Sequence, residues 1–391
     1  MRCSRSLAAL ALLIAPLLRA QVDLADWKTD VSKRSIELAE LERSVGRDAF
    51  LAVDRPSFAS VEEAAGWLTP GEPVLVVEIE GLARAYPIQI LLFHELVNDR
   101  LAGVPLLVSF CPLCNSAVVF DRRLAGRELA FGVSGFLRNS DMVIYDRRTE
   151  TLWQQLTGEA LVGELSGARL TVLGSQTVSF ETFAASYPGG QVLEPVPGIG
   201  APYGQSHYVG YEWGRRDFLP VRLGKPLGVA PLERVVALSL GARPKAYSFD
   251  YLRRRVVVES KIESTRYVIL FDDDMLSAMD AERIADSRAV GSAGVFSPLL
   301  DGERLRFRRR KREIYDRKTG SRWDVLGRAV EGPLAGRRLR PIVHAQAFAF
   351  AWFVFYPETR LIGGRPEPGG AGIGASSRSR SEQSAVSRGP F

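Results

Sequence analysis

An internal repeat constrains the fold of this chain more than any other feature of its sequence. Five segments of the first half recur in the second half in the same order. Chance does not arrange five colinear matches, so the sequence predicts two tandem pseudo-repeats. The matching pairs are 76–87 with 235–248, 119–131 with 295–307, IYDRRTETLW (144–153) with IYDRKTGSRW (314–323), 163–170 with 332–339, and Tyr187-Pro188 with Tyr356-Pro357.

Each copy is composed mainly of short strand-like runs separated by turn residues. Two helices are expected in the first copy, over 88–99 after Pro87 and over 179–187 before Pro188. Regularly alternating strands and helices are absent, which argues against a doubly wound sheet. The predicted fold class is therefore α+β, mainly antiparallel β with short helices.

The domain organisation follows from the repeat and from its flanking segments. Arg2 and Arg5, followed by an apolar run too short to span a bilayer comfortably, predict a cleavable signal peptide and a periplasmic or secreted protein. The expected order is a signal peptide (1–20), a helical lead-in (21–70), a first copy (71–192), a Pro/Gly/Tyr-rich connector (193–230), a degenerate second copy (231–364) and a disordered tail (365–391).

The net charge of +6 comes mostly from the predicted signal peptide and tail, so the body of the protein is nearly neutral. A neutral body argues against nucleic acid as a partner. The one basic cluster, RFRRRKR (306–312), is expected at a solvated hairpin tip. After signal cleavage no stable membrane insertion is expected, and the sequence does not identify a small-molecule or protein partner.

Alignment of the two copies separates scaffold from candidate site. In this alignment His94 is equivalent to Arg255 and Glu95 to Val256, and Cys111 and Cys114 are equivalent to Asp272 and Met275. The second copy also deletes residues where the first has FGVSGFLRNSD (131–141). Both copies retain Tyr145/Tyr315, Asp146/Asp316, Arg147/Arg317 and Trp153/Trp323, which indicates an aromatic anchor and an Asp–Arg pair at a strand end. The candidate chemistry is thus confined to the first copy.

Cys111 and Cys114 lie in the motif CPLCN, whose spacing is compatible with a metal knuckle, a redox dithiol or a local disulfide. Strand-like residues flank the motif on both sides. The motif therefore lacks the helix N-terminus that lowers the thiol pKa in thioredoxin-like sites. We expect a thiophilic metal, copper or zinc, bound by Cys111, Cys114 and His94, with Met142 as a further soft ligand for copper. A redox pair and a structural disulfide remain the alternatives.

Other residues are candidates for roles around this motif. Glu95 is a candidate general base, which makes it a candidate catalytic residue with Cys111 and Cys114. Ser134, Asn139 and Asp141 in the glycine-bearing 131–141 segment are candidates for binding an anion, substrate or cofactor. A further alternative is a non-catalytic binding module that uses the connector aromatics Tyr203, Tyr208, Tyr211 and Trp213.

The motifs HELVND, SFCPLCNSAVVFDRR, the long segment 131–170 and APYGQSHYVGY together resemble a bacterial and archaeal family of exported proteins, domain of unknown function 3179. The resemblance extends from about Asp54 to Leu361 and implies no established activity. Members typically carry the His-Glu helix and the CPLC motif. The positions that match the family pattern are His94, Glu95, Cys111, Cys114, Ser134, Gly135, Asn139, Tyr145, Asp146, Trp153 and Gly158-Glu159.

Overall fold

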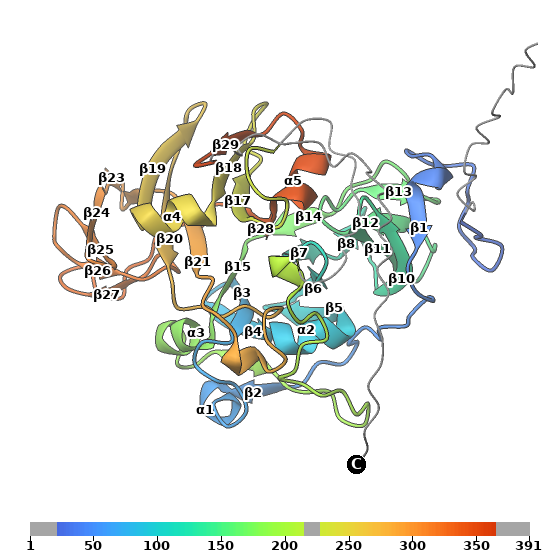
Figure 1. The fold of residues 1–391 in the computed structure, drawn as a ribbon, viewed down its shortest axis with the longest axis horizontal. Coiled ribbons are helices and arrows are strands. Elements are labelled where there is room, and N and C mark those ends of the chain that lie inside the picture. Colours follow the sequence, from blue (N-terminus) through green and yellow to red (C-terminus); the bar gives the residue numbers. More distant parts are fainter. Residues whose placement is uncertain (1–21, 215–226, 365–391) are drawn as a thin grey trace, which may run out of the picture.

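The computed structural model describes residues 22–214 and 227–364 (Figure 1). Nearly all strand pairs are antiparallel, and the helices are short. The predicted class, mainly antiparallel β with short helices, is confirmed. The predicted signal peptide, the tail and part of the connector lie outside the described residues. Within the described ranges, no helix is long and apolar enough to cross a membrane.

The first half begins with a lead-in and continues through three larger sheets (Figure 1). Its elements are η1 (Leu38–Glu40), β1 (Leu41–Arg43), β2 (Phe58–Ser60), α1 (Val61–Ala64), β3 (Pro73–Ile79), β4 (Leu82–Pro87), α2 (Ile88–His94), β5 (Leu96–Leu101), β6 (Val104–Cys111), β7 (Ser116–Asp121), β8 (Arg123–Leu124), β9 (Arg127–Glu128), β10 (Phe131–Arg138), β11 (Asp141–Asp146), β12 (Leu152–Gln154), β13 (Ala160–Val162), β14 (Thr171–Leu173), β15 (Ser175–Ser179), α3 (Phe180–Ser186) and β16 (Gln191–Leu193).

The second half follows a short helix in the connector. The elements are η2 (Tyr211–Trp213), β17 (Arg234–Leu238), β18 (Lys245–Ser248), α4 (Phe249–Arg255), β19 (Val257–Ile262), β20 (Thr265–Asp272), η3 (Ile284–Asp286), β21 (Ser292–Phe296), β22 (Leu299–Leu300), β23 (Glu303–Arg304), β24 (Phe307–Arg310), β25 (Glu313–Asp316), β26 (Arg322–Trp323), β27 (Ala329–Glu331), β28 (Ala345–Phe348), α5 (Ala349–Phe355) and β29 (Arg360–Ile362).

Corresponding sheets of the two halves have the same strand order. One sheet runs β15-β3-β4-β16 in the first half, and its counterpart runs β28-β17-β18-β29. In each, the last strand named pairs parallel with its neighbour, whereas the other pairs are antiparallel. The hairpin β10–β11 with β12 and β13 likewise corresponds to β24–β27.

The helix expected over 88–99 is shorter than the sequence predicts. It ends at His94 because Glu95 has a positive φ of 59°, and the chain continues directly as β5. The apolar residues of β5 are buried and pair with β6, so sheet pairing outweighs the local helix preference. Val256 ends α4 in the same way, with a φ of 64°.

The lead-in is less helical than predicted. Its described residues, 22–70, contain η1 and the four-residue α1 as their only helices, and its strands β1 and β2 add to β10 and β16. Val53 forms a bridge to Val97 of β5. The lead-in backbone therefore obtains hydrogen bonds from sheets of the first half, and this replaces the hydrogen bonds of a helix.

The residues that the sequence matches between the two halves form similar buried networks. Asp146 accepts hydrogen bonds from Thr149 and from Trp153 Nε1 (3.2 Å), and Asp316 accepts them from Thr319 and from Trp323 Nε1 (3.2 Å). The aromatic anchor thus has the expected place. The expected Asp–Arg pair does not form, because Arg147 instead donates to Asp54 at 2.6 Å.

Candidate functional site

The CPLC motif forms the tight turn between β6 and β7. Cys111 pairs with Ser116 across the hairpin, and Asn115 N donates to Pro112 O at 3.1 Å. Asn115 has a φ of 47°, a left-handed conformation that asparagine tolerates better than most residues. This turn places both cysteines in the buried interior, where both are free thiols.

A second tight turn, between β10 and β11, approaches the cysteines. Asn139 and Ser140 both have positive φ values, 54° and 61°, as a two-residue hairpin turn requires. Cys114 Sγ donates to Ser140 O at 3.3 Å. Asp141, the first residue of β11, follows directly and is completely buried.

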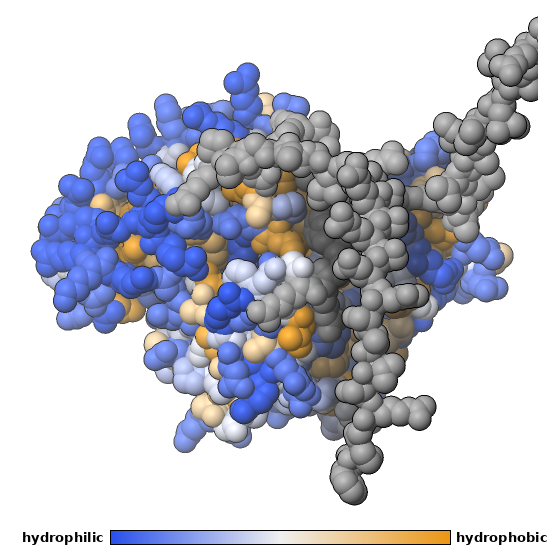
Figure 2. All heavy atoms as spheres, viewed as in Figure 1, coloured by the Kyte–Doolittle hydropathy of each residue, from blue (hydrophilic) through white to orange (hydrophobic). Residues whose placement is uncertain are grey.

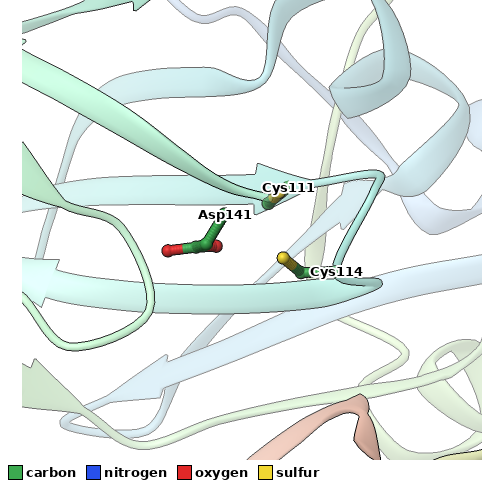
Figure 3. Close-up of side chains that lie close together, drawn as sticks. All are labelled: Cys111, Cys114 and Asp141. Carbon is green, nitrogen blue, oxygen red and sulfur yellow. The ribbon is translucent and has the colours of Figure 1, made fainter. Parts of the chain in front are cut away.

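Cys111, Cys114 and Asp141 form a compact cluster (Figure 3). Their sulfur and carboxylate ligand atoms all lie within 4.8 Å of one another, and all three side chains are buried. The cluster joins the β6–β7 turn to the start of β11. Among the described residues, this is the group of His, Cys, Asp and Glu side chains close enough to hold a metal ion.

The Asp141 carboxylate is only half satisfied. Oδ2 accepts hydrogen bonds from Gln154 Nε2 at 2.7 Å and from Leu156 N at 3.0 Å. Oδ1 is buried and has no hydrogen-bond partner in the described part of the chain. Burial raises the pKa of Asp141 to about 6, and burial also raises the pKa values of Cys111 and Cys114. The cluster therefore has three acidic groups whose charged forms need a cation.

A cavity of about 320 Å³ reaches Cys111. Glu95 lines it, together with Met142 and the connector residues Tyr208 and Tyr211. The Glu95 side chain is buried and makes no hydrogen bond with the described residues, and this burial raises its pKa to about 8. Glu95 has a positive φ and lies at the junction of α2 and β5. The cavity is therefore lined by the Glu95 carboxyl group and by the Cys111 thiol.

Distant segments hold the CPLC turn in place. Tyr211 in the connector donates its hydroxyl to Leu113 O at 3.1 Å, and Phe348 N at the end of β28 donates to Cys114 O at 2.8 Å. Gln155 bonds both Ser109 and Ser116 on the strands that flank the turn. The second half, which lacks the cysteines, thus supports the site in the first half.

His94 lies outside the cysteine cluster. Its Nδ1 donates to Leu51 O at 2.6 Å, so the neutral ring accepts the Tyr203 hydroxyl at Nε2 at 2.7 Å. Burial lowers its pKa, which favours this neutral form. Both nitrogens are therefore engaged in holding the lead-in and the connector, and the structure brings Asp141, not His94, to the two thiols.

The three residues of the 131–141 segment have different surroundings. Ser134 is buried in β10, where it donates to Val143 O and accepts from Phe136 N, and Asn139 forms the following turn. Only Asp141 joins the cysteines. The signal for Asp141 was present in the sequence, because the second half lacks this segment together with the cysteines. No sequence motif indicated that Gln154, Gln155 or Phe348 would contact the site.

The connector aromatics do not form one exposed surface. Tyr203 bonds His94, Tyr211 is buried, and Tyr208 lines the cavity. Trp213 is 45% exposed and lies beneath the Arg288 guanidinium, 3.7 Å from the ring centroid.

The metal-free protein is expected to lose stability with rising pH because of Glu95. Folding raises the pKa of this carboxyl from 4.5 to about 8, so its contribution to stability is complete below pH 4.5 and is lost as the pH rises through about 8. Glu95→Gln should flatten this part of the profile. Urea unfolding of chelator-treated protein across this range measures the effect, and identical profiles for the two proteins would contradict it.

Comparison with family models gives a match over residues 47–359 to a family described as protein of unknown function (DUF3179). Comparisons with curated proteins and with solved structures give no match. The matched region contains both halves, the cysteine cluster and the Glu95 cavity. The chain therefore belongs to the DUF3179 family.

Proposed function

We propose that the protein binds a thiophilic transition metal at Cys111, Cys114 and Asp141. The observation that carries the proposal is the buried Asp141 carboxylate, one oxygen of which lies within 4.8 Å of two free thiols, and whose Oδ1 lacks a hydrogen-bond partner among the described residues. A bound cation would supply the missing partner and stabilise all three groups as anions. The proposed ligand set replaces His94 with Asp141.

Zinc suits this ligand set best. Zinc accepts both thiolate and carboxylate ligands, at about 2.3 Å for sulfur and 2.0–2.2 Å for oxygen. Copper(I) prefers sulfur and imidazole, so a buried carboxylate favours zinc over copper. The raised thiol pKa values also argue against a redox dithiol, which requires a stabilised thiolate in the absence of metal.

A zinc ion held by these three side chains would have one coordination position left for water or a substrate. The cavity reaches Cys111, and Glu95 lines the same cavity. Three ligands with one open position are typical of catalytic zinc sites, where a bound water becomes a nucleophile near neutral pH. We assign Glu95 the role of proton acceptor beside this position, since a nearby cation lowers the pKa of a carboxyl group.

The metal content of the purified protein tests the proposal. We expect one zinc per chain in protein isolated without chelator, and loss of that zinc in Cys111→Ser and Cys114→Ser. Asp121→Asn is a matched control for charge removal, because Asp121 lies on β7 and pairs with Arg123 at the surface.

Two outcomes would contradict zinc binding. Copper in place of zinc would indicate a sulfur-dominated site. Absence of metal, with thiols that appear only after reduction, would indicate a disulfide between Cys111 and Cys114.

Two further sequence predictions concern the origin of the two halves and the export of the protein. We infer that the two halves descend from one duplicated unit, an inference supported by their shared strand order and by the paired Asp146 and Asp316 networks. Export through a cleavable signal peptide is supported by the N-terminal sequence alone. N-terminal sequencing of the protein from the periplasm or culture medium tests export.

A further inference from the structure

A basic groove lies in the second half, away from the cysteine cluster. Its volume is about 800 Å³, and it lies between the end of α4, the strand β19 and the hairpin β24–β25. Hydrophilic residues cover this side of the molecule (Figure 2). The lining residues on which the argument depends are Arg255, Val257, Glu259, Arg308, Arg309 and Arg317.

The corresponding place in the first half is filled by the chain's own lead-in. Val53 N donates to Leu96 O and Asn98 N donates to Val53 O, both at 2.9 Å, so the segment adds to the outer edge of β5. This bridge is parallel. The added segment, DAFLAVD (48–54), carries an aspartate at each end; Asp48 lies in a turn with a φ of 51°, and Val53 forms the bridge.

Side chains of the first half recognise this segment at three points. His94 Nδ1 donates to Leu51 O at 2.6 Å. The Asp54 carboxylate accepts from Asn98 Nδ2 at 2.9 Å and from Arg147 at 2.6 Å. At the other end, Asp48 accepts from Tyr145 OH at 2.6 Å and its amide donates to Val133 O.

The second half keeps the same edge, and no segment among the described residues pairs with it. Val257 pairs with Leu270 as Leu96 pairs with Ser109, and β19 is an edge strand. Phe271 N donates to Val256 O as Phe110 N donates to Glu95 O, so the two strands direct equivalent backbone groups outward. The O of Val257 and the N of Glu259 therefore correspond to the groups that bind Val53.

The recognising side chains of the second half are cationic. Arg255 corresponds to His94, and Arg317 corresponds to Arg147, the partner of Asp54. Arg308 and Arg309 lie at the end of the groove that corresponds to Asp48. The one acid, Glu259, is already bound by Phe307 N at 3.0 Å and Arg304 at 3.3 Å.

We propose that this groove binds an extended acidic segment of another protein, which adds to β19 as a strand. The open strand edge supplies sequence-independent backbone bonds, as in other cases of β-strand addition. The arginines supply the preference for acidic side chains, since guanidinium groups form strong bonds with carboxylates. A free anion would use the arginines and leave the strand edge without a partner.

A peptide with the chain's own sequence DAFLAVD, blocked at both ends, is the probe. We expect the full-length protein to bind it, with affinity that falls as salt rises. Asn in place of the peptide's last Asp, or Arg317→Gln in the protein, should each weaken binding about 10-fold. Arg322→Gln is the control, since Arg322 pairs with Glu331 on β26–β27 outside the groove.

Amide hydrogen exchange locates the bound peptide. Protection at Glu259 upon peptide addition would support strand addition to β19. Loss of protection at Val53, whose amide is bonded to Leu96 O, without protection at Glu259 would place the peptide on β5 in exchange with the lead-in, and would overturn the proposal. Equal weakening by Arg317→Gln and Arg322→Gln, complete displacement by inorganic sulfate without any protection at Glu259, or no binding at millimolar peptide would also overturn it.

Discussion

Asp141→Asn is expected to weaken zinc binding on the order of 1,000-fold, whereas His94→Gln should weaken it less than about threefold. The first substitution retains the size of the side chain but removes the negative charge that zinc requires. Asn can still accept from Gln154 and from Leu156 N, so the local fold should persist. The second substitution removes a ring that binds Leu51 and Tyr203.

Competition with a chromophoric zinc chelator at a fixed pH measures both affinities. Asp121→Asn again serves as the matched control, and circular dichroism shows whether each variant is folded. The reverse order, with His94→Gln the more damaging, would restore the ligand set expected from the sequence and refute the one proposed from the structure. Equal affinity of wild type and Asp141→Asn would remove Asp141 from the metal site.

Trp153→Ala is expected to lower the free energy of unfolding by about 3–5 kcal/mol. Trp153 is fully buried, packs edge-on against Phe131 with ring centroids 6.0 Å apart, and donates Nε1 to Asp146. Its removal leaves a large cavity and takes a donor from a buried carboxylate. It also loosens β12, whose next residue, Gln154, holds Asp141.

Trp323→Ala is the matched variant in the second half, where Trp323 packs against Phe307 at 5.6 Å and donates to Asp316. We expect a similar loss of stability but a smaller effect on zinc, because the second half lacks the cluster. Trp213→Ala, at a 45% exposed side chain, should cost less than about 1 kcal/mol. Urea unfolding measures all three, and a loss at Trp153 no greater than at Trp213 would contradict the anchor role.

Several features of this protein follow from local sequence. The dominance of antiparallel strands follows from short apolar runs separated by turn residues, which need only neighbouring residues to form hairpins. The turn at Asn115 is an example, because four residues between two strands leave few backbone conformations. The matched positions of Asp146 and Asp316 likewise follow from the recurring IYDR motif.

Other features depend on contacts between residues far apart in the chain. The helix expected over 88–99 ends at His94 because β5 pairs with β6 and with Val53 of the lead-in. Helix propensity is a small energy per residue, and burial of a whole strand exceeds it. A single sequence does not reveal which distant segment will cover a strand edge.

The sequence by itself determined that the candidate site is centred on Cys111 and Cys114 in the first half, because the second half lacks cysteines. Only the tertiary structure decided the third member of the cluster. Asp141 reaches the thiols because the β10–β11 turn packs on the β6–β7 turn, whereas hydrogen bonds to Leu51 and Tyr203 hold the His94 ring. These placements are long-range packing outcomes, and spacing along the chain does not encode them.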